Sequence, residues 1–378
     1  MERPVFQPVG TPVEELDTPA LVVDLDVMES NITRFHSSLK VNGSRFHIRP
    51  HVSTHQCPHI AHIQAAAAGP ENGIAVNTVG EAEVFAGAGF DDILISSPIA
   101  GRPKIARLCA LAQSHRITVA VDSTGSIDVL SNAASAAGVI LGILVEVDAG
   151  SRRSGVPMGE DAAVLAKHIS ASHGLRLAGL MAAFPDRTGQ RVLMEGCDAP
   201  SGGEGENKAR LQELMETSKL VQQQAAQATV VSVTDSANYL ISEVPGITEM
   251  QAGHYPLTDS AHFQVQPDCQ PAARVLASVI SHPTVGSAVL DAGHKSTGPD
   301  LGLPVLEGDP DAKAVRFSAE HGVLDLAESA QRRYMPGEKV WLVPFDLELS
   351  INQYDYIRAV RRGKLEGFWP IAARGRFS

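Results

Sequence analysis

The feature of this sequence that most constrains its fold is a regular alternation of short apolar runs with longer amphipathic segments, from Ala20 to about Gly253. Segments with helical apolar spacing separate most of the runs, as at Lys104 to Gln113 and Asp161 to Ala171. Eight strands that alternate with helices predict an α/β fold, a parallel (β/α)8 barrel of the TIM type. A doubly wound sheet is the alternative, but eight repeats without a reversal favour closure. The eight strand-like runs are Ala20 to Asp24, Phe46 to Pro50, Gly73 to Thr78, Ile93 to Ser97, Ile117 to Asp122, Gly142 to Asp148, Leu177 to Ala183 and Val230 to Thr234.

The pattern changes after about Arg274, where short alternating runs are separated by turns such as Arg362-Gly363. Runs of this kind predict a small antiparallel β domain. The predicted strands are Val275 to Ser281, Ser287 to Asp291, Ala314 to Phe317, Lys339 to Val343, Tyr354 to Val360 and Leu365 to Pro370. We therefore divide the chain into an N-terminal arm at residues 1–17, a barrel at residues 18–270 and a β domain at residues 271–378.

Composition restricts the partners and the compartment. A formal net charge of −12 over 378 residues argues against nucleic acid or an anionic membrane surface as a partner. No apolar run approaches the roughly 20 residues of a membrane span, and the opening residues do not resemble a signal peptide. The 4 cysteines are scattered without a CxxC pair, so we expect reduced packing residues in a cytoplasmic protein.

A cluster of polar residues follows the second predicted strand, in the stretch Arg49-Pro50-His51-Val52-Ser53-Thr54-His55. The period of two in an extended chain puts the arginine, both histidines and the serine on one face. The end of a parallel strand is where α/β barrels carry their active-site residues. Taken alone, the stretch is equally compatible with a surface turn that carries two solvated histidines.

Motifs along nearly the whole chain resemble the D-threonine aldolase and D-serine dehydratase family, which has a barrel of the alanine racemase N-terminal type, fold type III. The opening Leu16-Asp17-Thr18-Pro19-Ala20 is similar to the start of that family. The resemblance implies a homodimer in which the β domain of one chain closes the barrel mouth of the other, with the N-terminal arm joined to the β domain. The other matching motifs are Gly80-Glu81-Ala82-Glu83, Val145-Glu146-Val147-Asp148-Ala149-Gly150, Pro245 to Gly253, Asp291-Ala292-Gly293-His294-Lys295 and Glu320-His321-Gly322.

The family's pyridoxal phosphate anchors are altered in this sequence. In the family a lysine carries the cofactor as an imine, and the matching residue here is Ser53, whose hydroxyl cannot form one. A glycine-rich loop that binds the phosphate in the family is matched here by Ser232-Val233-Thr234-Asp235-Ser236. Valine blocks close backbone approach, and the Asp235 carboxylate would repel a phosphate. We therefore expect no covalently held pyridoxal phosphate.

The family's metal motif is also changed. It reads Pro-x-His-x-Cys or Pro-x-His-x-Asp in the family and Pro344-Phe345-Asp346-Leu347-Glu348 here. Alternation along a strand would put Asp346 and Glu348 on one face. Two hard oxygen donors favour Mg²⁺ or Mn²⁺ over Zn²⁺. The alternatives are an acidic surface turn, or an empty carboxylate pair with raised pKa values.

Four residues are the predicted catalytic set. His51 and His55 are the candidate general bases, because neutral imidazole titrates near working pH. Arg153 matches the arginine that the family places against the cofactor's phenolic oxygen. Without that cofactor, its guanidinium can hold a substrate carboxylate, although a structural salt bridge is equally compatible. Ser53 would donate a hydrogen bond where the lysine stands in the family.

Four more residues are predicted to bind substrate. Arg49 belongs to the polar stretch, Tyr255 and His321 fall on positions that match the family, and His254 replaces a small hydroxyl residue. His254 is also a candidate extra ligand or base, with a packed or solvated histidine as its alternative. Residues 185–207, rich in glycine and containing Arg187 and Arg191, are either an active-site lid or a surface loop.

These observations predict a metal-dependent, pyridoxal-phosphate-independent lyase. It would cleave or dehydrate a small hydroxy or oxo acid, with the metal taking the role of the cofactor's electron sink. One alternative is an enzyme that holds pyridoxal phosphate noncovalently and acts on a D-hydroxy amino acid. The other is a catalytically inactive binding protein on the same fold.

Overall fold

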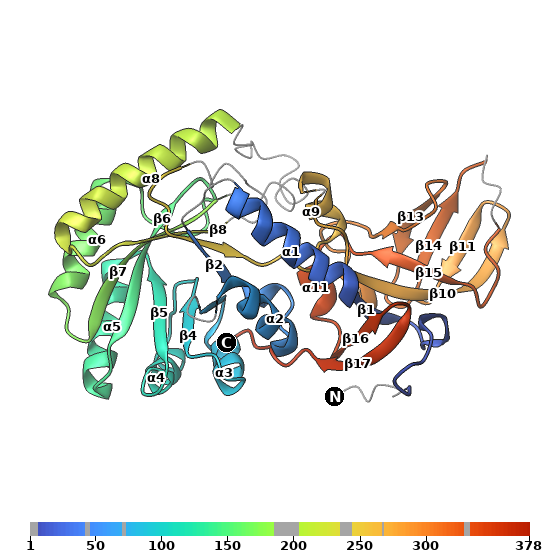
Figure 1. Ribbon diagram of the computed structural model, residues 1–378, viewed down its shortest axis with the longest axis horizontal. Helices are drawn as coiled ribbons and strands as arrows, with labels where there is room; N and C mark the ends of the chain where they lie inside the picture. Colours follow the sequence, from blue (N-terminus) through green and yellow to red (C-terminus); the bar gives the residue numbers. More distant parts are fainter. Residues whose placement is uncertain are drawn as a thin grey trace.

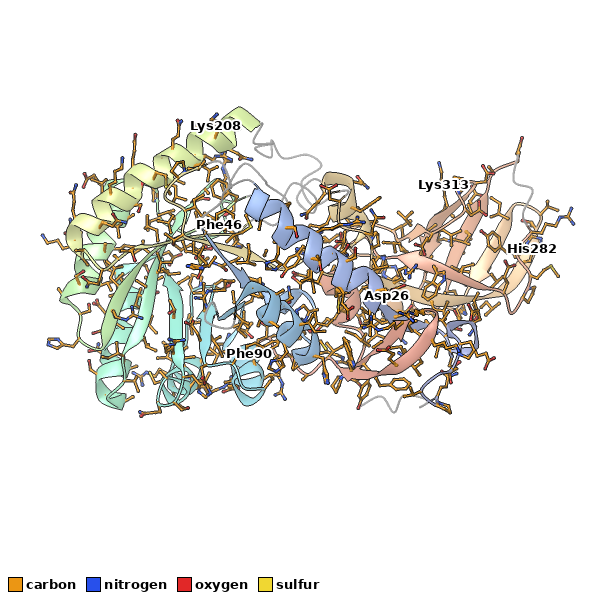
Figure 2. All side chains as sticks on the ribbon, in the orientation of Figure 1. Asp26, Phe46, Phe90, Lys208, His282 and Lys313 are labelled. Atoms are coloured by element: carbon orange, nitrogen blue, oxygen red, sulfur yellow. The ribbon has the colours of Figure 1, made fainter. Side chains whose placement is uncertain are left out.

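The computed structural model describes residues 7–41, 46–69, 73–184, 204–234, 244–266, 268–328 and 333–378. Two sheets organise these residues (Figure 1): a parallel sheet surrounded by helices and a separate, mainly antiparallel sheet. Charged side chains such as Lys208 and Lys313 extend outward from the ribbon (Figure 2). No helix in the described ranges is long and apolar enough to cross a membrane.

The parallel sheet is a nearly closed barrel. Its eight strands run in the order β2-β9-β8-β7-β6-β5-β4-β3, and a bridge between His51 and Ala75 brings the two edge strands together. The strands are β2 (His47–Pro50), β3 (Ile74–Val76), β4 (Asp92–Ile95), β5 (Arg116–Val121), β6 (Leu141–Asp148), β7 (Leu175–Ala183), β8 (Val230–Thr234) and β9 (Glu249–Ala252). The helices around them are α2 (Pro58–Ala68), α3 (Val79–Gly87), α4 (Arg102–Leu111), α5 (Thr124–Ala137), α6 (Glu160–Ala171) and α8 (Glu204–Gln224).

The prediction of a barrel is confirmed, but one of its strands was assigned wrongly. The run Ala20–Asp24 forms β1, which pairs with β10 and β16 of the other sheet. The eighth barrel strand is β9, which carries the polar residues Glu249 and Gln251. An apolar run indicates a buried strand but not the sheet to which it belongs. A strand with polar residues that face a barrel interior lacks that apolar signal.

The second sheet contains the remaining strands. Its main path is β13-β14-β11-β10-β1-β16-β17, and β15 pairs with β10 and β12. The predicted runs overlap six of these strands, whereas β12 and β14 were not predicted. The strands are β10 (Ala273–Thr284), β11 (Ser287–Leu290), β12 (Val305–Leu306), β13 (Ala312–Phe317), β14 (Gly322–Leu326), β15 (Lys339–Val343), β16 (Tyr356–Arg361) and β17 (Lys364–Pro370).

Helix α1, the N-terminal segment and several short helices complete the described fold. Helix α1 (Leu25–Val41) follows β1 and lies between the barrel and the second sheet (Figure 1). Val13 and Leu16, at the 3₁₀ turn η1 (Val13–Glu15), pack with Leu276 and Leu365 of the second sheet. The other short helices are η2 (Val52–Thr54), α9 (Ser260–Val265), α10 (His294–Thr297) and α11 (Leu347–Ile351).

Candidate active site

A cavity of about 290 Å³ lies at the ends of the barrel strands. Side chains that follow β2, β3, β4, β6 and β9 contribute to its lining, as expected for the carboxyl end of a parallel barrel. Asp346 and Glu348, at the start of α11, line it from the segment that follows β15. The cavity is therefore built by the barrel and by a segment of the second sheet together.

The predicted metal pair lines this cavity, but on a helix start rather than on a strand. Asp346 is the N-cap of α11, where its Oδ1 accepts a hydrogen bond from the backbone N–H of Leu349 at 3.0 Å. Oε1 of Glu348 accepts a hydrogen bond from the hydroxyl of Thr54 at 3.0 Å. An Asp-x-Glu spacing fits the first turn of a helix as well as a strand, because Asp is a preferred N-cap and Glu favours the first turn.

Burial and a neighbouring carboxylate raise the pKa of each of these carboxyls. Burial, followed by the nearby charge of Asp346, raises the pKa of Glu348 to about 7. The pKa of Asp346 is also raised, first by burial and then by the charge of Asp259. Carboxylates brought together in this way disfavour their own ionisation, and a cation between them would restore it.

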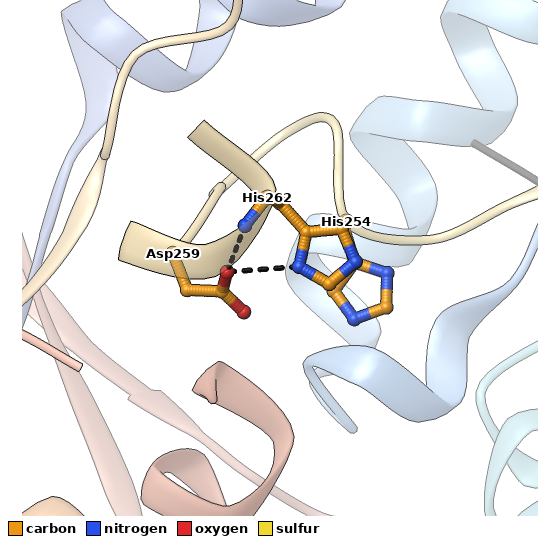
Figure 3. A group of neighbouring side chains, drawn as sticks. All are labelled: His254, Asp259 and His262. Carbon is orange, nitrogen blue, oxygen red and sulfur yellow. Dashed lines mark hydrogen bonds and ion pairs between the residues drawn. The ribbon is translucent and has the colours of Figure 1, made fainter. Parts of the chain in front are cut away.

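Two stacked imidazoles, drawn in Figure 3, also line the cavity. The rings of His254 and His262 are 3.6 Å apart between centroids and inclined by 16°. Nε2 of His254 lies 3.5 Å from Oε1 of Glu348. Oδ1 of Asp259 accepts hydrogen bonds from the backbone N–H and from Nδ1 of His262, both at 2.8 Å. Potential ligand atoms of His254, Asp259 and His262 all lie within 4.8 Å of one another.

His262 and Asp259 were not predicted from the sequence. Asp259 is the N-cap of α9, and His262 follows three residues later in its first turn. The only local signal is this Asp-x-x-His spacing, which is common at helix starts without any functional role. His262 lines the cavity and Asp259 is buried behind it, and this placement depends on contacts that are distant in the sequence.

The lining also includes His51 and Arg153. Nε2 of His51 lies 3.0 Å from the hydroxyl of Ser96, and Asn77 lines the cavity nearby. Burial lowers the pKa of His51 to about 4, and the positive charge of Arg153 contributes. The imidazole is therefore neutral at physiological pH, as a general base must be.

The loop that presents Arg153 is fixed at both of its ends. Oδ1 of Asp148 accepts hydrogen bonds from the backbone N–H groups of Gly150 at 2.8 Å and Arg152 at 3.0 Å. The hydroxyl of Ser154 donates to Oε1 of the buried Glu146 at 2.6 Å. These contacts hold an exposed guanidinium at the cavity on a tightly bonded turn.

Two of the predicted catalytic residues lie behind the cavity lining. The Ser53 hydroxyl donates to Oε2 of Glu81 at 2.8 Å and accepts from the backbone N–H of Asn77 at 3.0 Å. Nδ1 of His55 accepts from the backbone N–H of Cys57 at 3.1 Å, and its Nε2 lies 2.7 Å from Oε1 of Gln64. Both side chains are buried, and neither contributes to the lining.

Of the predicted substrate-binding residues, His254 lines the cavity and the other three have different surroundings. Arg49 forms ion pairs with Asp92 at 2.9 Å and Glu249 at 2.7 Å. The buried ring of Tyr255 stacks on Phe35 at 4.1 Å between centroids. His321 is exposed in the turn between β13 and β14.

The described lining fits a metal better than pyridoxal phosphate. No lysine is among the described residues that line the cavity, so none offers an amine for an imine there. Carboxylate oxygens and imidazole nitrogens are, by contrast, common ligands of divalent metals. Asp235, Ser236, Arg187, Arg191 and the greater part of the predicted lid lie outside the described residues.

Comparisons with known proteins agree with this architecture. The alanine racemase N-terminal domain model matches residues 23–258, and the putative serine dehydratase domain model matches residues 272–360. The chain is 31% identical over 378 residues to 3-hydroxy-D-aspartate aldolase of Paracoccus denitrificans, covering 97% of this chain and 94% of that protein. The crystal structure of D-threonine aldolase from Filomicrobium marinum superposes with a TM-score of 0.90 at 32% identity, covering 100% of both chains. A mutant D-threo-3-hydroxyaspartate dehydratase in its metal-free form has a TM-score of 0.81 at 26% identity, covering 95% of this chain and 98% of that one.

Proposed function

Because the chain belongs to the alanine racemase N-terminal and serine dehydratase domain family, whose relatives here are aldolases and dehydratases, we propose that it is a divalent-metal-dependent lyase that works without pyridoxal phosphate. The observation that best supports this proposal is that two carboxylates and an arginine line the same small cavity. Asp346 and Glu348 face it from α11, and Arg153 faces it from the loop after β6.

The carboxylates of Asp346 and Glu348 would hold the metal. A bound divalent ion would supply Lewis-acid stabilisation of the negative charge that develops on a hydroxy or oxo acid during cleavage or dehydration. The metal-free form of a related dehydratase is a further indication that the family uses metals.

Arg153 would orient the substrate. Its guanidinium can form two parallel hydrogen bonds with a carboxylate, which fixes both the position and the rotation of a small acid. The cavity volume of about 290 Å³ is at the small end of the range of about 300 to 1,000 Å³ that is typical of ligand pockets. A small hydroxy or oxo acid matches both the charge and the size of the site.

His51 would accept the proton. The Ser96 hydroxyl can donate to the carbonyl of Val76, 3.2 Å away, and its oxygen then accepts from Nε2–H of His51. With the hydroxyl in that orientation, Nε2 of His51 carries the hydrogen and Nδ1 is the basic nitrogen. A pKa lowered to about 4 keeps the imidazole unprotonated over the physiological range, but also makes it a weaker base than a free imidazole.

The absence of an imine-forming group supports independence from pyridoxal phosphate. Ser53 has no amine, and its hydroxyl is directed to Glu81. Among the described residues, the cavity lining contains no lysine that could substitute for it. A cofactor bound without an imine would also lack the lysine that normally moves protons on it.

The proposal is tested on protein purified without added cofactor, by elemental analysis together with an ultraviolet–visible spectrum. We expect about one divalent ion per chain, no pyridoxal absorption band, and chelator-sensitive cleavage or dehydration of small hydroxy or oxo acids. A pyridoxal band would favour a noncovalent pyridoxal phosphate enzyme that acts on a D-hydroxy amino acid. A preparation that holds neither metal nor cofactor, and gains no activity with added Mg²⁺ or Mn²⁺, would indicate a binding protein.

A further inference from the structure

We propose that His254 is a third protein ligand of the ion held by Asp346 and Glu348, and that His262, fixed by Asp259, is a positioning residue for it. This inference rests on the proposed function, because it takes the carboxylate pair as a metal site. It adds a ligand from the barrel to two ligands from the segment after β15. The metal would then join the barrel mouth to the second sheet.

The distance between His254 and Glu348 is the first argument. Nε2 of His254 lies 3.5 Å from Oε1 of Glu348, which is long for a charge-assisted hydrogen bond. Two ligand atoms that each lie about 2.1 Å from one ion are about 3.0 to 3.5 Å apart at octahedral or tetrahedral angles. The separation of these two atoms is therefore suited to neighbouring ligands of one ion.

The stacking of the two imidazoles decides which of them binds. An imidazole lone pair lies in the plane of its ring, and the two rings are nearly parallel, with centroids 3.6 Å apart. Two rings stacked in this way cannot both direct a nitrogen in plane at a single ion. His254 has its Nε2 beside Glu348, whereas Nδ1 of His262 lies 2.8 Å from Asp259. His254 is therefore the ligand, and His262 provides the surface on which its ring rests.

Asp259 is better placed to orient than to bind. Its Oδ1 accepts two hydrogen bonds from His262, and its Oδ2 accepts one from the backbone N–H of Leu347 at 3.1 Å. Carboxylates that hold a histidine near a metal commonly fix its tautomer and ring orientation. Through these bonds Asp259 fixes the position of the stacked rings relative to the start of α11.

The imidazole narrows the choice of metal. Mg²⁺ takes oxygen ligands almost exclusively, whereas a nitrogen donor favours a transition metal. Two carboxylates and one imidazole are a donor set that Mn²⁺ accepts. We therefore expect the site to bind Mn²⁺ more tightly than Mg²⁺.

The test is to add Mn²⁺ to the metal-free full-length chain. Calorimetry gives the Kd, and electron paramagnetic resonance of the bound ion shows which ligands it has. The wild-type spectrum should show nitrogen hyperfine coupling from one histidine, and selective ¹⁵N labelling of histidine should change that coupling. His254→Ala should raise the Kd for Mn²⁺ by about 100-fold and abolish the coupling. His262→Gln should keep the coupling and raise the Kd by about tenfold, the usual effect of an outer-shell change. His168→Ala, on the outer helix α6, is the matched control and should leave both measurements unchanged.

The outcomes separate the two proposals. Wild-type Mn²⁺ affinity and coupling in His254→Ala, with binding lost in Asp346→Asn and Glu348→Gln, would overturn the inference and leave the metal-dependent function standing. Loss of coupling in His262→Gln alone would also overturn it, because the ligand would then be His262. No Mn²⁺ binding to wild type would overturn both proposals. If His254→Ala fails to fold, His254→Asn, which keeps a polar side chain at this position, replaces it, and unchanged histidine coupling in that variant would overturn the inference.

Discussion

Oδ2 of Asp259 accepts a hydrogen bond from the backbone N–H of Leu347 at 3.1 Å, across 88 positions of sequence. Leu347 separates the two carboxylates of the cavity, and the other oxygen of Asp259 holds His262. One buried side chain therefore joins the barrel side of the site to the start of α11. The hydrogen bonds from the Thr54 hydroxyl to Glu348 and from the backbone N–H of Ser260 to the carbonyl of Pro344 link the same two parts.

Asp259→Ala is expected to lower the free energy of unfolding of the metal-free protein by about 2 to 4 kcal/mol, because buried N–H groups lose their acceptor. Denaturant titration measures this loss. Asp128→Ala is the matched control, since Asp128 is exposed and pairs with His168 at the surface. The control should cost less than about 1 kcal/mol. Equal losses in the two variants would mean that Asp259 does not couple the two parts.

His55 should make the protein sensitive to acid. Burial lowers its pKa to about 4, and its hydrogen bond with Gln64 only partly offsets this effect. The folded-state pKa is therefore below the ordinary value of about 6.5, so protonation favours the unfolded chain. The stabilisation is fully present above pH 6.5 and is lost as the pH falls from 6.5 toward 4, by about 3 kcal/mol at most.

Unfolding free energies of wild type and His55→Gln, measured between pH 4 and 8, check this prediction. The wild-type value should fall with pH across that window, and the variant should show a shallower slope. His51, whose pKa is also lowered to about 4, retains its own contribution in both proteins. Parallel slopes in the two proteins would contradict the assignment to His55.

The barrel was predictable because apolar runs and amphipathic segments alternate along the chain. The wrong assignment of β1 to the barrel also has a local cause. The run of β1 is apolar and is buried in the second sheet, so its pattern resembles that of a barrel strand. Strand β9 carries Glu249 and Gln251, which bond to Ser232 and Arg49 rather than to apolar neighbours. A pattern of apolar residues cannot identify a strand whose inward side chains are polar.

The residues of the site that lie within one short sequence motif were predictable. Asp346 and Glu348 are two positions apart, and both line the cavity, although on a helix start. His262 reaches the same cavity because the start of α9 is bonded to the segment at the start of α11, and no sequence spacing encodes that approach. Arg49 is the opposite case, since a polar residue at a strand end is bound by two carboxylates and does not line the cavity.

Ser53→Ala should affect stability rather than metal binding. The hydroxyl donates to the buried carboxylate of Glu81, which also accepts from the backbone N–H groups of Asn77 and Thr78. Loss of one of these partners is expected to cost about 1 kcal/mol. Thermal melting and Mn²⁺ calorimetry should therefore give a lower Tm and an unchanged Kd. A weakened Kd at unchanged Tm would mean that Ser53 acts in the cavity itself.

Arg153→Met should separate substrate binding from metal binding. The guanidinium lines the cavity, and its turn is fixed by Asp148 and Glu146, so a methionine of similar length should leave the loop in place. Loss of a charge-assisted pair with a carboxylate, worth roughly 1.5 to 3 kcal/mol, corresponds to a KM increase of about 10- to 150-fold. The Kd for Mn²⁺ should change little.

Arg153→Lys should recover only part of the loss, because an ammonium cannot form the two parallel bonds. Full recovery by lysine would indicate that charge alone, and not the planar fork, holds the substrate.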